Sequence, residues 1–230
     1  MPLVDSSEEP QDLLSSVSID NVIFGIKDNR LKVLLVHPNL DDRPGYWALP
    51  GGHIKVDEDL RAGAGRVLQH LTGLKNVHLR QLRAFGEVAR LPDKRIITIG
   101  YYALVRSTLK ITANLVSDWC DIAKLPPLML DHDRILQAGI HRLRQDARFT
   151  PIGFELLPKK FTLTQLQKIY EAIFDAPLDK GNFRRKVLKH GFLIELDEKQ
   201  MNVAHRAARY YRFDPRAYRN YQKSGFAPLI

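Results

Sequence analysis

The chain has 230 residues, 44% of them hydrophobic and 27% charged, which is enough for one large or two modest domains with a hydrophobic core. It has no run of about 18 apolar residues and no signal-peptide pattern, so the sequence predicts a soluble, cytoplasmic protein without a membrane partner. The single cysteine, Cys120, excludes an intrachain disulfide framework and a zinc site built from cysteines, and we interpret it as a packed side chain.

The positive charge is concentrated in the last third of the chain. The formal net charge is +9; residues 151–230 hold 15 Lys and Arg against 8 Asp and Glu, whereas residues 1–150 hold 20 against 18. A basic region of this kind attracts anionic partners. We therefore expect an anionic partner to bind the C-terminal part of the chain.

The N-terminal residues differ in character from the rest of the chain. Residues 1–16 are acidic and polar without periodicity, and we expect them to form a disordered tail. Residues 22–26 and 31–36 are strand-type runs around a polar turn at 27–30, which indicates a β-hairpin.

A helix is predicted at residues 59–72, where apolar residues recur at helical spacing. Positions 67, 70 and 71 share one face of this helix. Carboxylates on that face could hold Mg²⁺, which takes oxygen ligands, but the chain has Val67, His70 and Leu71 there. We interpret His70 as structural or solvent-facing. This face therefore offers no set of carboxylates for a metal ion.

Two more strand-type runs are present at residues 79–89 and 95–106, and Trp119 belongs to a further short strand. Asp131 is a natural N-cap for an amphipathic helix at residues 133–146. Strands interleaved with two long helices are typical of an α/β domain in which helices cover a mixed sheet. We assign residues 17–148 to this domain and residues 149–160, which are rich in proline and glycine, to a linker.

The C-terminal region, residues 161–230, has the outline of a winged helix-turn-helix domain. Thr162 and Gln165 form a capping box at the start of one helix, and a second helix is predicted from Lys180 to His190. Strand-type runs at 192–196 and 209–213 then form the hairpin that makes the wing.

The second helix carries a polar and basic stripe, because Asn182, Arg185, Lys186 and Lys189 stand at i, i+3, i+4 and i+7. Arginine reads guanine and asparagine reads adenine in the major groove, and lysines neutralise phosphates. A solvated charged face is the usual alternative, but a recognition-helix position, a basic hairpin and the charge excess coincide here. The residues that we expect to contact DNA are Thr164, Lys180, Asn182, Arg184, Arg185, Lys186, Lys189, His205, Arg206 and Arg209.

The segment from Gly52 to Leu74 resembles the Nudix box, written G-x5-E-x7-R-E-U-x-E-E-x-G-U with U a bulky aliphatic residue. Gly52, Glu58, Arg66, Leu68, Gly73 and Leu74 match it, whereas its last three glutamates, the metal positions of the pattern, are replaced by Val67, His70 and Leu71. The resemblance therefore implies no metal site, no cofactor, no catalytic residues and no enzymatic activity. Together with residues 130–133, 151–158, 161–167 and 178–186, the chain resembles the NrtR-type regulators over about residues 17–220.

This resemblance implies a Nudix-like α/β/α sandwich joined to a winged helix, a homodimer and a palindromic double-stranded operator. It also implies a small-molecule effector in the degenerate Nudix pocket, for example ADP-ribose or a sugar such as arabinose. The residues that we expect to contact the effector are Trp47, Glu58, Arg66, Arg95 and Tyr101. Each has a structural alternative, since Arg66 can pair with Glu58 or Asp57 and the aromatic residues can belong to the core.

Two other functions compete with a transcriptional repressor or activator. One is a divergent Nudix hydrolase of a nucleoside diphosphate derivative that holds a metal through Glu58 and carboxylates such as Asp57, Asp59 or Glu87. The other is an assembly scaffold that uses the winged helix for protein contacts.

Overall fold

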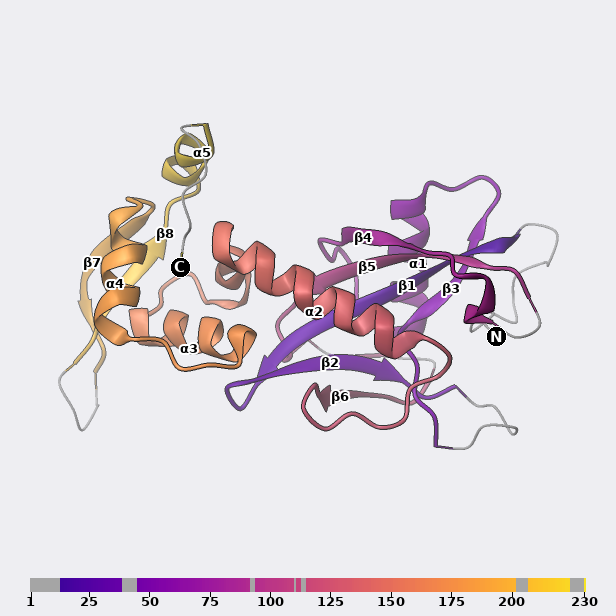
Figure 1. Cartoon of the computed structure of the whole chain (residues 1–230). Coiled ribbons are helices and arrows are strands. Elements are labelled where there is room, and N and C mark those ends of the chain that lie inside the picture. Colours follow the sequence, from indigo (N-terminus) through magenta and orange to yellow (C-terminus); the bar gives the residue numbers. More distant parts are fainter. Residues whose placement is uncertain are drawn as a thin grey trace. The chain divides into compact units, whose positions relative to one another are not determined.

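The computed structural model describes residues 13–38, 45–91, 94–109, 111–112, 115–201, 207–223 and 230. The chain forms two compact units (Figure 1). The first unit comprises the residues up to Arg142 except Asp28–Arg30, and the second comprises Asp28–Arg30 and the residues from Leu143 onward. In the described part of the chain, no helix has the length and apolar character needed to cross a membrane.

The first unit is built on a mixed β-sheet. Its strands are β1 (Leu13–Lys27), β2 (Arg30–Val36), β3 (Gly51–Lys55), β4 (Arg80–Phe85), β5 (Ile97–Leu104) and β6 (Ser117–Asp121). They follow the order β4-β5-β1-β2-β6, and β3 pairs with β1. β1 and β5 are parallel, whereas β1 pairs antiparallel with β3 and β4 with β5. The predicted mixed sheet and its short strand around Trp119 are therefore confirmed.

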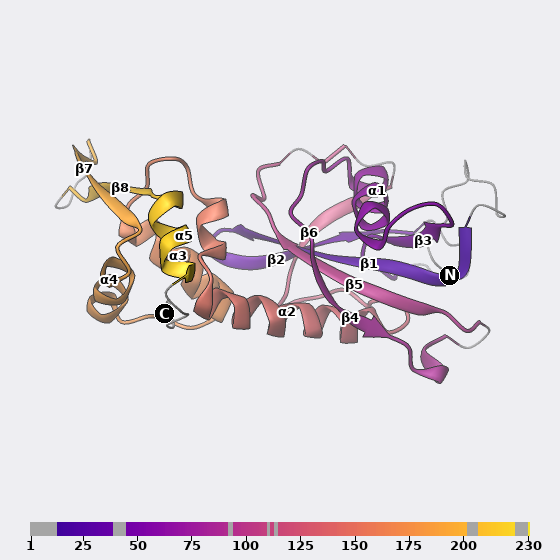
Figure 2. The ribbon, with the colours of Figure 1, turned by 90° about the horizontal axis from the view of Figure 1, so that it is seen from above.

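Two helices, α1 (Leu60–Thr72) and α2 (His132–Phe149), cover opposite faces of this sheet (Figure 2). Successive side chains of a strand point to opposite faces. In β1, Ile19 and Ile23 join Ala64 and Leu68 of α1 in one hydrophobic cluster. On the other face, Val22 lies against Gly139 of α2, where an added Cβ would come within 3.0 Å of the valine. The predicted sandwich is confirmed by this arrangement.

The N-terminal boundary differs from the expected one. β1 begins at Leu13, so residues 13–16, which the sequence assigns to a disordered tail, belong to a strand. Leu13 pairs with Lys55 of β3. Residues 13–16 are therefore held by backbone pairing with a distant strand. The local composition of the sequence does not reveal such pairing.

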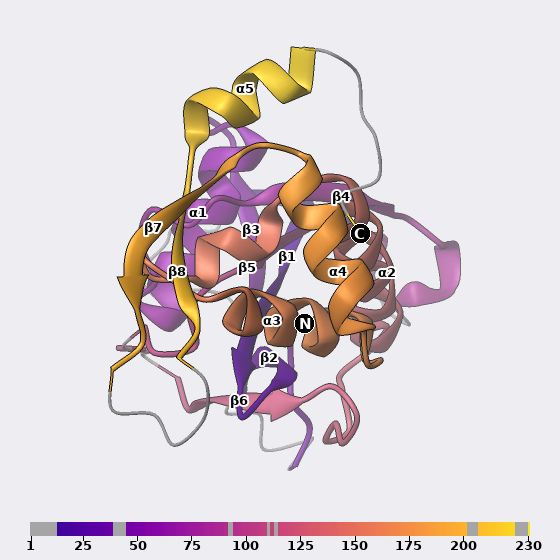
Figure 3. The same ribbon diagram turned by 90° about the vertical axis from the view of Figure 1, so that its left-hand side faces the viewer.

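The second unit contains η3 (Ile152–Leu156), α3 (Leu163–Phe174), α4 (Lys180–Lys189), β7 (Leu193–Lys199), β8 (Arg209–Phe213) and α5 (Pro215–Lys223). β7 and β8 form an antiparallel hairpin, and Phe161 bridges to Tyr211 of β8. Figure 3 shows α3, α4 and this hairpin together. The predicted winged helix-turn-helix fold is confirmed, while α5 is an element that the sequence pattern does not predict.

The segment at 149–160 is not a linker. Within η3, Ile152 and Gly153 are buried, and the Phe154 ring lies 4.9 to 6.0 Å from the rings of Phe161, Phe192 and Phe213. Proline and glycine suggest a connector, but the segment contributes a central aromatic residue to the core of the second unit.

Candidate functional site

The outward face of α4 is polar and basic. Asp179 caps the helix by accepting a hydrogen bond from the Asn182 backbone N–H at 2.7 Å, and Phe183 and Val187 are buried. Asn182, Arg185, Lys186 and Lys189 are consequently exposed on the opposite side. Arg185 also donates a hydrogen bond to Asn182 Oδ1 at 2.9 Å. This contact leaves the amide N–H groups of Asn182 available and holds the two side chains together.

A groove of about 830 Å³ runs between the start of α3, the start of α4 and the β7–β8 hairpin. Its cationic lining residues are Lys168, Lys180, Arg184, Lys199 and Arg209, and no described lining residue carries a carboxylate. The groove is therefore strongly positive. When such cations bind the phosphates of a polyanion, the polyanion releases its counterions, and this release favours binding of the polyanion to the groove.

The N-terminus of α3 opens into the same groove. Thr162 Oγ1 accepts a hydrogen bond from Gln165 N at 3.2 Å, and Gln165 Oε1 accepts one from Thr162 N at 2.8 Å, so the predicted capping box is confirmed. The exposed Thr164 lies in the first turn, and its hydroxyl accepts a 3.4 Å contact from Arg184. The positive end of the helix dipole adds to the attraction for anions.

Among its described residues, the hairpin contributes Arg209 to the expected DNA-binding set. Arg209 lines the groove and pairs with Glu195, which also accepts a hydrogen bond from the Tyr211 hydroxyl at 2.9 Å. These hydrogen bonds lower the pKa of the Glu195 carboxyl. The expected contacts His205 and Arg206 lie outside the described residues.

In the first unit, Glu58 and Arg66 form a fixed ion pair. Arg66 Nε donates to Glu58 Oε2 at 2.9 Å, its Nη2 donates to Oε1 at 2.5 Å, and the same nitrogen donates to the His53 carbonyl at 2.9 Å. The Lys55 backbone N–H donates to Glu58 Oε1 at 2.8 Å. These bonds join the middle of α1 and the loop before it to β3, which is the structural alternative given above for Arg66.

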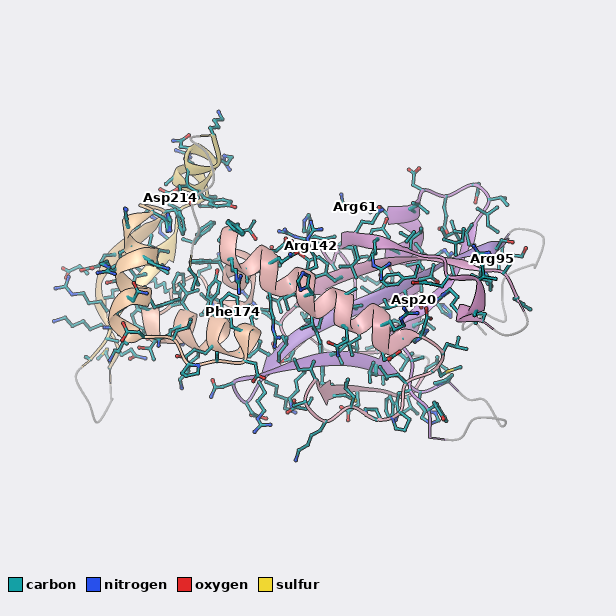
Figure 4. The ribbon with its side chains drawn as sticks, viewed as in Figure 1. Asp20, Arg61, Arg95, Arg142, Phe174 and Asp214 are labelled. Atoms are coloured by element: carbon teal, nitrogen blue, oxygen red, sulfur yellow. The ribbon has the colours of Figure 1, made fainter. Side chains whose placement is uncertain are left out.

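The other expected effector residues are dispersed. Tyr101 is 3% exposed within the hydrophobic cluster beneath α1, and the Trp47 ring makes an edge contact with His37 at 5.4 Å. Arg95 is exposed (Figure 4) and donates to the Gly86 carbonyl at 2.8 Å. None of these three residues, nor Glu58 or Arg66, lines a small polar cavity that the described part of the first unit contains.

That cavity lies on the α2 side of the sheet and has a volume of about 30 Å³. Its polar lining includes Ser18 and Asp20 from β1, Thr98 from β5, and His132 at the start of α2. Figure 4 places Asp20 beside the first turn of α2. Sequence reasoning missed this cluster, although an acidic residue between Ile19 and Val22 in a strand was a usable signal.

A buried ion pair borders the cavity. Arg90 Nε and Nη2 donate to the two carboxylate oxygens of Asp131 at 2.9 and 2.8 Å, and the side chains are only 3% and 8% exposed. Asp131 directly precedes α2, as predicted for its N-cap, and its carbonyl accepts a hydrogen bond from Ile135 N at 3.2 Å, while its carboxylate accepts from Arg90.

The three positions where the Nudix pattern has glutamates and this chain does not lie on α1. Val67 and Leu71 are buried at 4% and 5% exposure and contribute to the core, and His70 is half-buried. Within the described ranges, no group of three or more His, Cys, Asp or Glu side chains is placed to hold a metal ion.

The Glu58–Arg66 pair is expected to make the unfolding free energy of the first unit fall at acid pH. Burial raises the pKa of the Glu58 carboxyl, but the hydrogen bonds from Arg66 and Lys55 outweigh burial and lower it below its ordinary value of 4.5. The pair therefore stabilises the folded state above pH 4.5, and this contribution is lost as pH falls through the lowered pKa. We expect the unfolding free energy to fall less between about pH 5 and about pH 3 in Glu58→Gln than in the wild-type protein.

Tryptophan fluorescence during urea unfolding measures this effect, because both tryptophans, Trp47 and Trp119, belong to the first unit. Asp57→Asn, at an exposed position in the same loop, is the matched control and is expected to follow the wild-type curve. An unchanged acid dependence in Glu58→Gln contradicts the prediction.

Comparisons with known proteins agree with both units. A model described as "NUDIX domain" matches residues 18–139, and one described as "NrtR DNA-binding winged helix domain" matches residues 153–213. The fold and the basic groove thus define a Nudix domain joined to a DNA-binding winged helix. The "ADPR responsive transcriptional repressor NtrR" of Acinetobacter baylyi is 33% identical over 214 residues, which cover 90% of this chain and 84% of the relative. The chain belongs to the NrtR family of Nudix-related transcriptional regulators.

Two further relatives extend the comparison. The crystal structure of Shewanella oneidensis NrtR complexed with a 27mer DNA matches with a TM-score of 0.74 and 30% identity, and the match covers 88% of this chain and 95% of that one. An ADP-ribose pyrophosphatase of Methanocaldococcus jannaschii is 27% identical over 124 residues, or 53% of this chain and 71% of the relative. Of these three relatives, the two that match most of the chain are regulators.

Proposed function

We propose that this protein is a transcriptional repressor that binds operator DNA through its second unit and responds to ADP-ribose or a related nucleotide through its first. The observation that carries the proposal is the combination of an exposed polar stripe on α4 with a cation-lined groove beside it. The DNA-bound Shewanella relative supports DNA as the polyanion, and the Acinetobacter relative, which is named as an ADPR responsive repressor, supports ADP-ribose as the effector.

The two surfaces have separate tasks in this proposal. Arg185 and Asn182 enter the major groove, where an arginine makes two hydrogen bonds to guanine and an asparagine two to adenine. Lys186 and Lys189, together with the groove residues Lys180 and Arg184, bind phosphates, which positions the protein without reading sequence. Thr164 and Arg209 add contacts from α3 and the hairpin.

A palindromic operator requires two copies of the chain. In the proposed homodimer, the two α4 helices lie about 34 Å apart and face successive major grooves on one side of the DNA. The effector changes DNA binding only through a difference in its affinity for DNA-competent and DNA-incompetent dimers.

The first unit binds its effector without hydrolysing it in this proposal. Pyrophosphate hydrolysis by Nudix enzymes depends on Mg²⁺ held by oxygen ligands, and the buried Val67 and Leu71 supply none. Glu58 is occupied by Arg66 and Lys55. The similarity to an ADP-ribose pyrophosphatase keeps hydrolysis as the second candidate function. Hydrolysis is favoured if the wild-type protein turns over ADP-ribose in the presence of Mg²⁺ or Mn²⁺ and Glu58→Gln abolishes this turnover.

The test is capture of genomic fragments by the full-length protein at near-physiological salt, with and without ADP-ribose. Non-specific phosphate attraction weakens steeply with salt, whereas base readout persists. Enrichment of one palindromic site whose capture changes with ADP-ribose supports the proposal. Retention that is independent of sequence and lost with salt contradicts it.

A substitution on α4 sharpens this test. Arg185→Ala is expected to weaken binding to the captured operator by roughly 10- to 100-fold, the loss of one bidentate base contact, and to weaken binding to a scrambled duplex far less. Fluorescence anisotropy with both duplexes measures the two affinities. Arg219→Ala removes an equally exposed arginine from α5 and is the control. An equal loss on both duplexes shows that Arg185 contacts only phosphate.

A further inference from the structure

We infer that the polar cavity between β1, β5 and the start of α2 binds the hydroxyl groups of a sugar ring in the effector, and does not bind its phosphates. The inference rests on the proposed function, since it assigns a ligand group to the effector-sensing unit. It concerns the residues Ser18, Asp20, Thr98 and His132, which we call the hydroxyl pocket.

The hydroxyl pocket contains a buried carboxylate, Asp20, that has few hydrogen-bond partners in the described part of the protein. Asp20 is 6% exposed, yet its one side-chain partner among the described residues is His132, whose Nε2 lies 3.7 Å from Asp20 Oδ1. An N–H···O hydrogen bond is usually about 2.7 to 3.2 Å long, so this contact is too long to satisfy the carboxylate fully. Burial of a polar group without a full partner is costly, which is expected where a ligand supplies the missing bonds.

The hydrogen-bonding roles of the two side chains follow from their surroundings. His132 Nδ1 accepts a hydrogen bond from the Leu49 backbone N–H at 2.9 Å. In the neutral ring the hydrogen then resides on Nε2, which faces Asp20. The pocket thus presents a donor beside an acceptor. A hydroxyl group between them can donate to Asp20 and accept from His132, because it has both capacities.

A second pair of hydroxyls lines the same cavity. Ser18 and Thr98 are opposite one another in the parallel pairing of β1 with β5, and their side-chain oxygens are in hydrogen-bond contact. Both residues are nearly inaccessible, at 5% and 1% exposure. Each oxygen can donate or accept. Vicinal hydroxyls, such as those of a ribose, have the donors and acceptors that suit both pairs.

Phosphate does not fit this chemistry. Asp20 repels an anion, and the guanidinium of Arg90, which also lines the cavity, is held by both oxygens of Asp131. The cavity volume of about 30 Å³ is small, so it admits the edge of a sugar ring and excludes larger groups. The phosphates and any base of the ligand then remain outside.

The backbone next to Asp20 is adapted to keep this space open. At Gly51, an added Cβ would lie 2.1 Å from Asp20 Oδ1 and 2.9 Å from the Ile19 carbonyl. Any other residue at position 51 would displace the carboxylate.

The experiment compares full-length wild-type protein with Asp20→Asn by isothermal titration calorimetry. The probes are ADP-ribose, ADP, ribose 5-phosphate and inorganic pyrophosphate. Asp20→Asn is nearly isosteric and replaces one acceptor oxygen by a donor. It is expected to weaken ADP-ribose binding at least tenfold, while operator affinity without effector stays within about twofold and pyrophosphate binding is unchanged. Asp118→Asn on the exposed side of β6 is the matched control.

The smaller probes identify which sugar occupies the pocket. Weaker ADP binding in Asp20→Asn assigns the ribose of the adenosine, whereas weaker binding of ribose 5-phosphate with unchanged ADP assigns the terminal ribose. Ser18→Ala, which removes one hydroxyl and no charge, is expected to weaken the same probe. It provides the test if Asp20→Asn does not fold.

The contrary outcomes are distinct. Wild-type affinity for ADP-ribose in both folded variants overturns the hydroxyl pocket and leaves the proposed function intact. An equal loss of pyrophosphate binding overturns the pocket as well, because it places phosphate at Asp20. A wild-type protein that binds operator DNA but none of the nucleotide or sugar probes overturns both proposals.

Discussion

Replacing Lys168, Lys180 and Arg184 together by glutamine is expected to weaken binding to operator and to unrelated duplex DNA by the same factor, roughly a hundredfold at physiological salt. All three line the groove beside α3, where no described lining residue is acidic. Each phosphate contact contributes about 0.9 to the slope of log affinity against log salt concentration. The triple variant is therefore expected to bind DNA with a slope shallower by about 2.7.

A salt titration by fluorescence anisotropy checks both quantities. Lys75, Lys94 and Lys124 are exposed in the first unit, and their replacement by glutamine gives a control with the same change in net charge. If the control loses as much affinity as the groove variant, overall charge and not the groove determines binding. If the groove variant loses affinity only for operator, these residues read bases.

Arg90→Ala is expected to lower the free energy of unfolding of the first unit by about 3 to 5 kcal/mol, because it leaves Asp131 buried without its partner. Both side chains are almost inaccessible, and two hydrogen bonds join them. Urea unfolding followed by tryptophan fluorescence reports the effect, since both tryptophans belong to this unit.

The double variant Arg90→Met with Asp131→Leu is compared with Arg90→Ala to separate loss of the ion pair from burial of an unpaired charge. Replacing a buried ion pair by apolar side chains is often close to neutral, because the desolvation cost of both charges disappears. We expect it to be more stable than Arg90→Ala alone. A loss below about 1 kcal/mol in Arg90→Ala means that water reaches Asp131 and that the pair is not buried in solution.

The local features of the sequence predicted much of the second unit. The Thr162–Gln165 capping box marked the start of a helix, and the structure confirms both the box and the helix α3. The exposed stripe on α4 also follows from helical periodicity, because Phe183 and Val187 fix which side faces inward. In contrast, η3 and α5 depend on aromatic contacts with Phe192 and Phe213, which residue patterns do not reveal.

The candidate effector site was harder to predict. The five residues expected there came from the resemblance to the NrtR-type regulators, and their role in effector binding stays a prediction. In the structure Glu58 binds Arg66, Arg95 binds the Gly86 carbonyl and Tyr101 lies in a hydrophobic cluster. The hydroxyl pocket is instead assembled from β1, β5 and α2. Its contribution from β5 depends on a parallel pairing, which places Thr98 opposite Ser18 across a long separation in sequence.

The sequence by itself determined the classes of element, their caps, the inward and outward faces of the helices and the loss of carboxylates from the Nudix box. These properties depend on residues a few positions apart, and helical and strand periodicity relate such residues directly. Only the tertiary structure decided that Asp20 meets His132, that Arg90 meets Asp131 and that five cations line one groove. Those contacts depend on sheet register and on how helices pack, which long-range burial determines and local patterns do not encode.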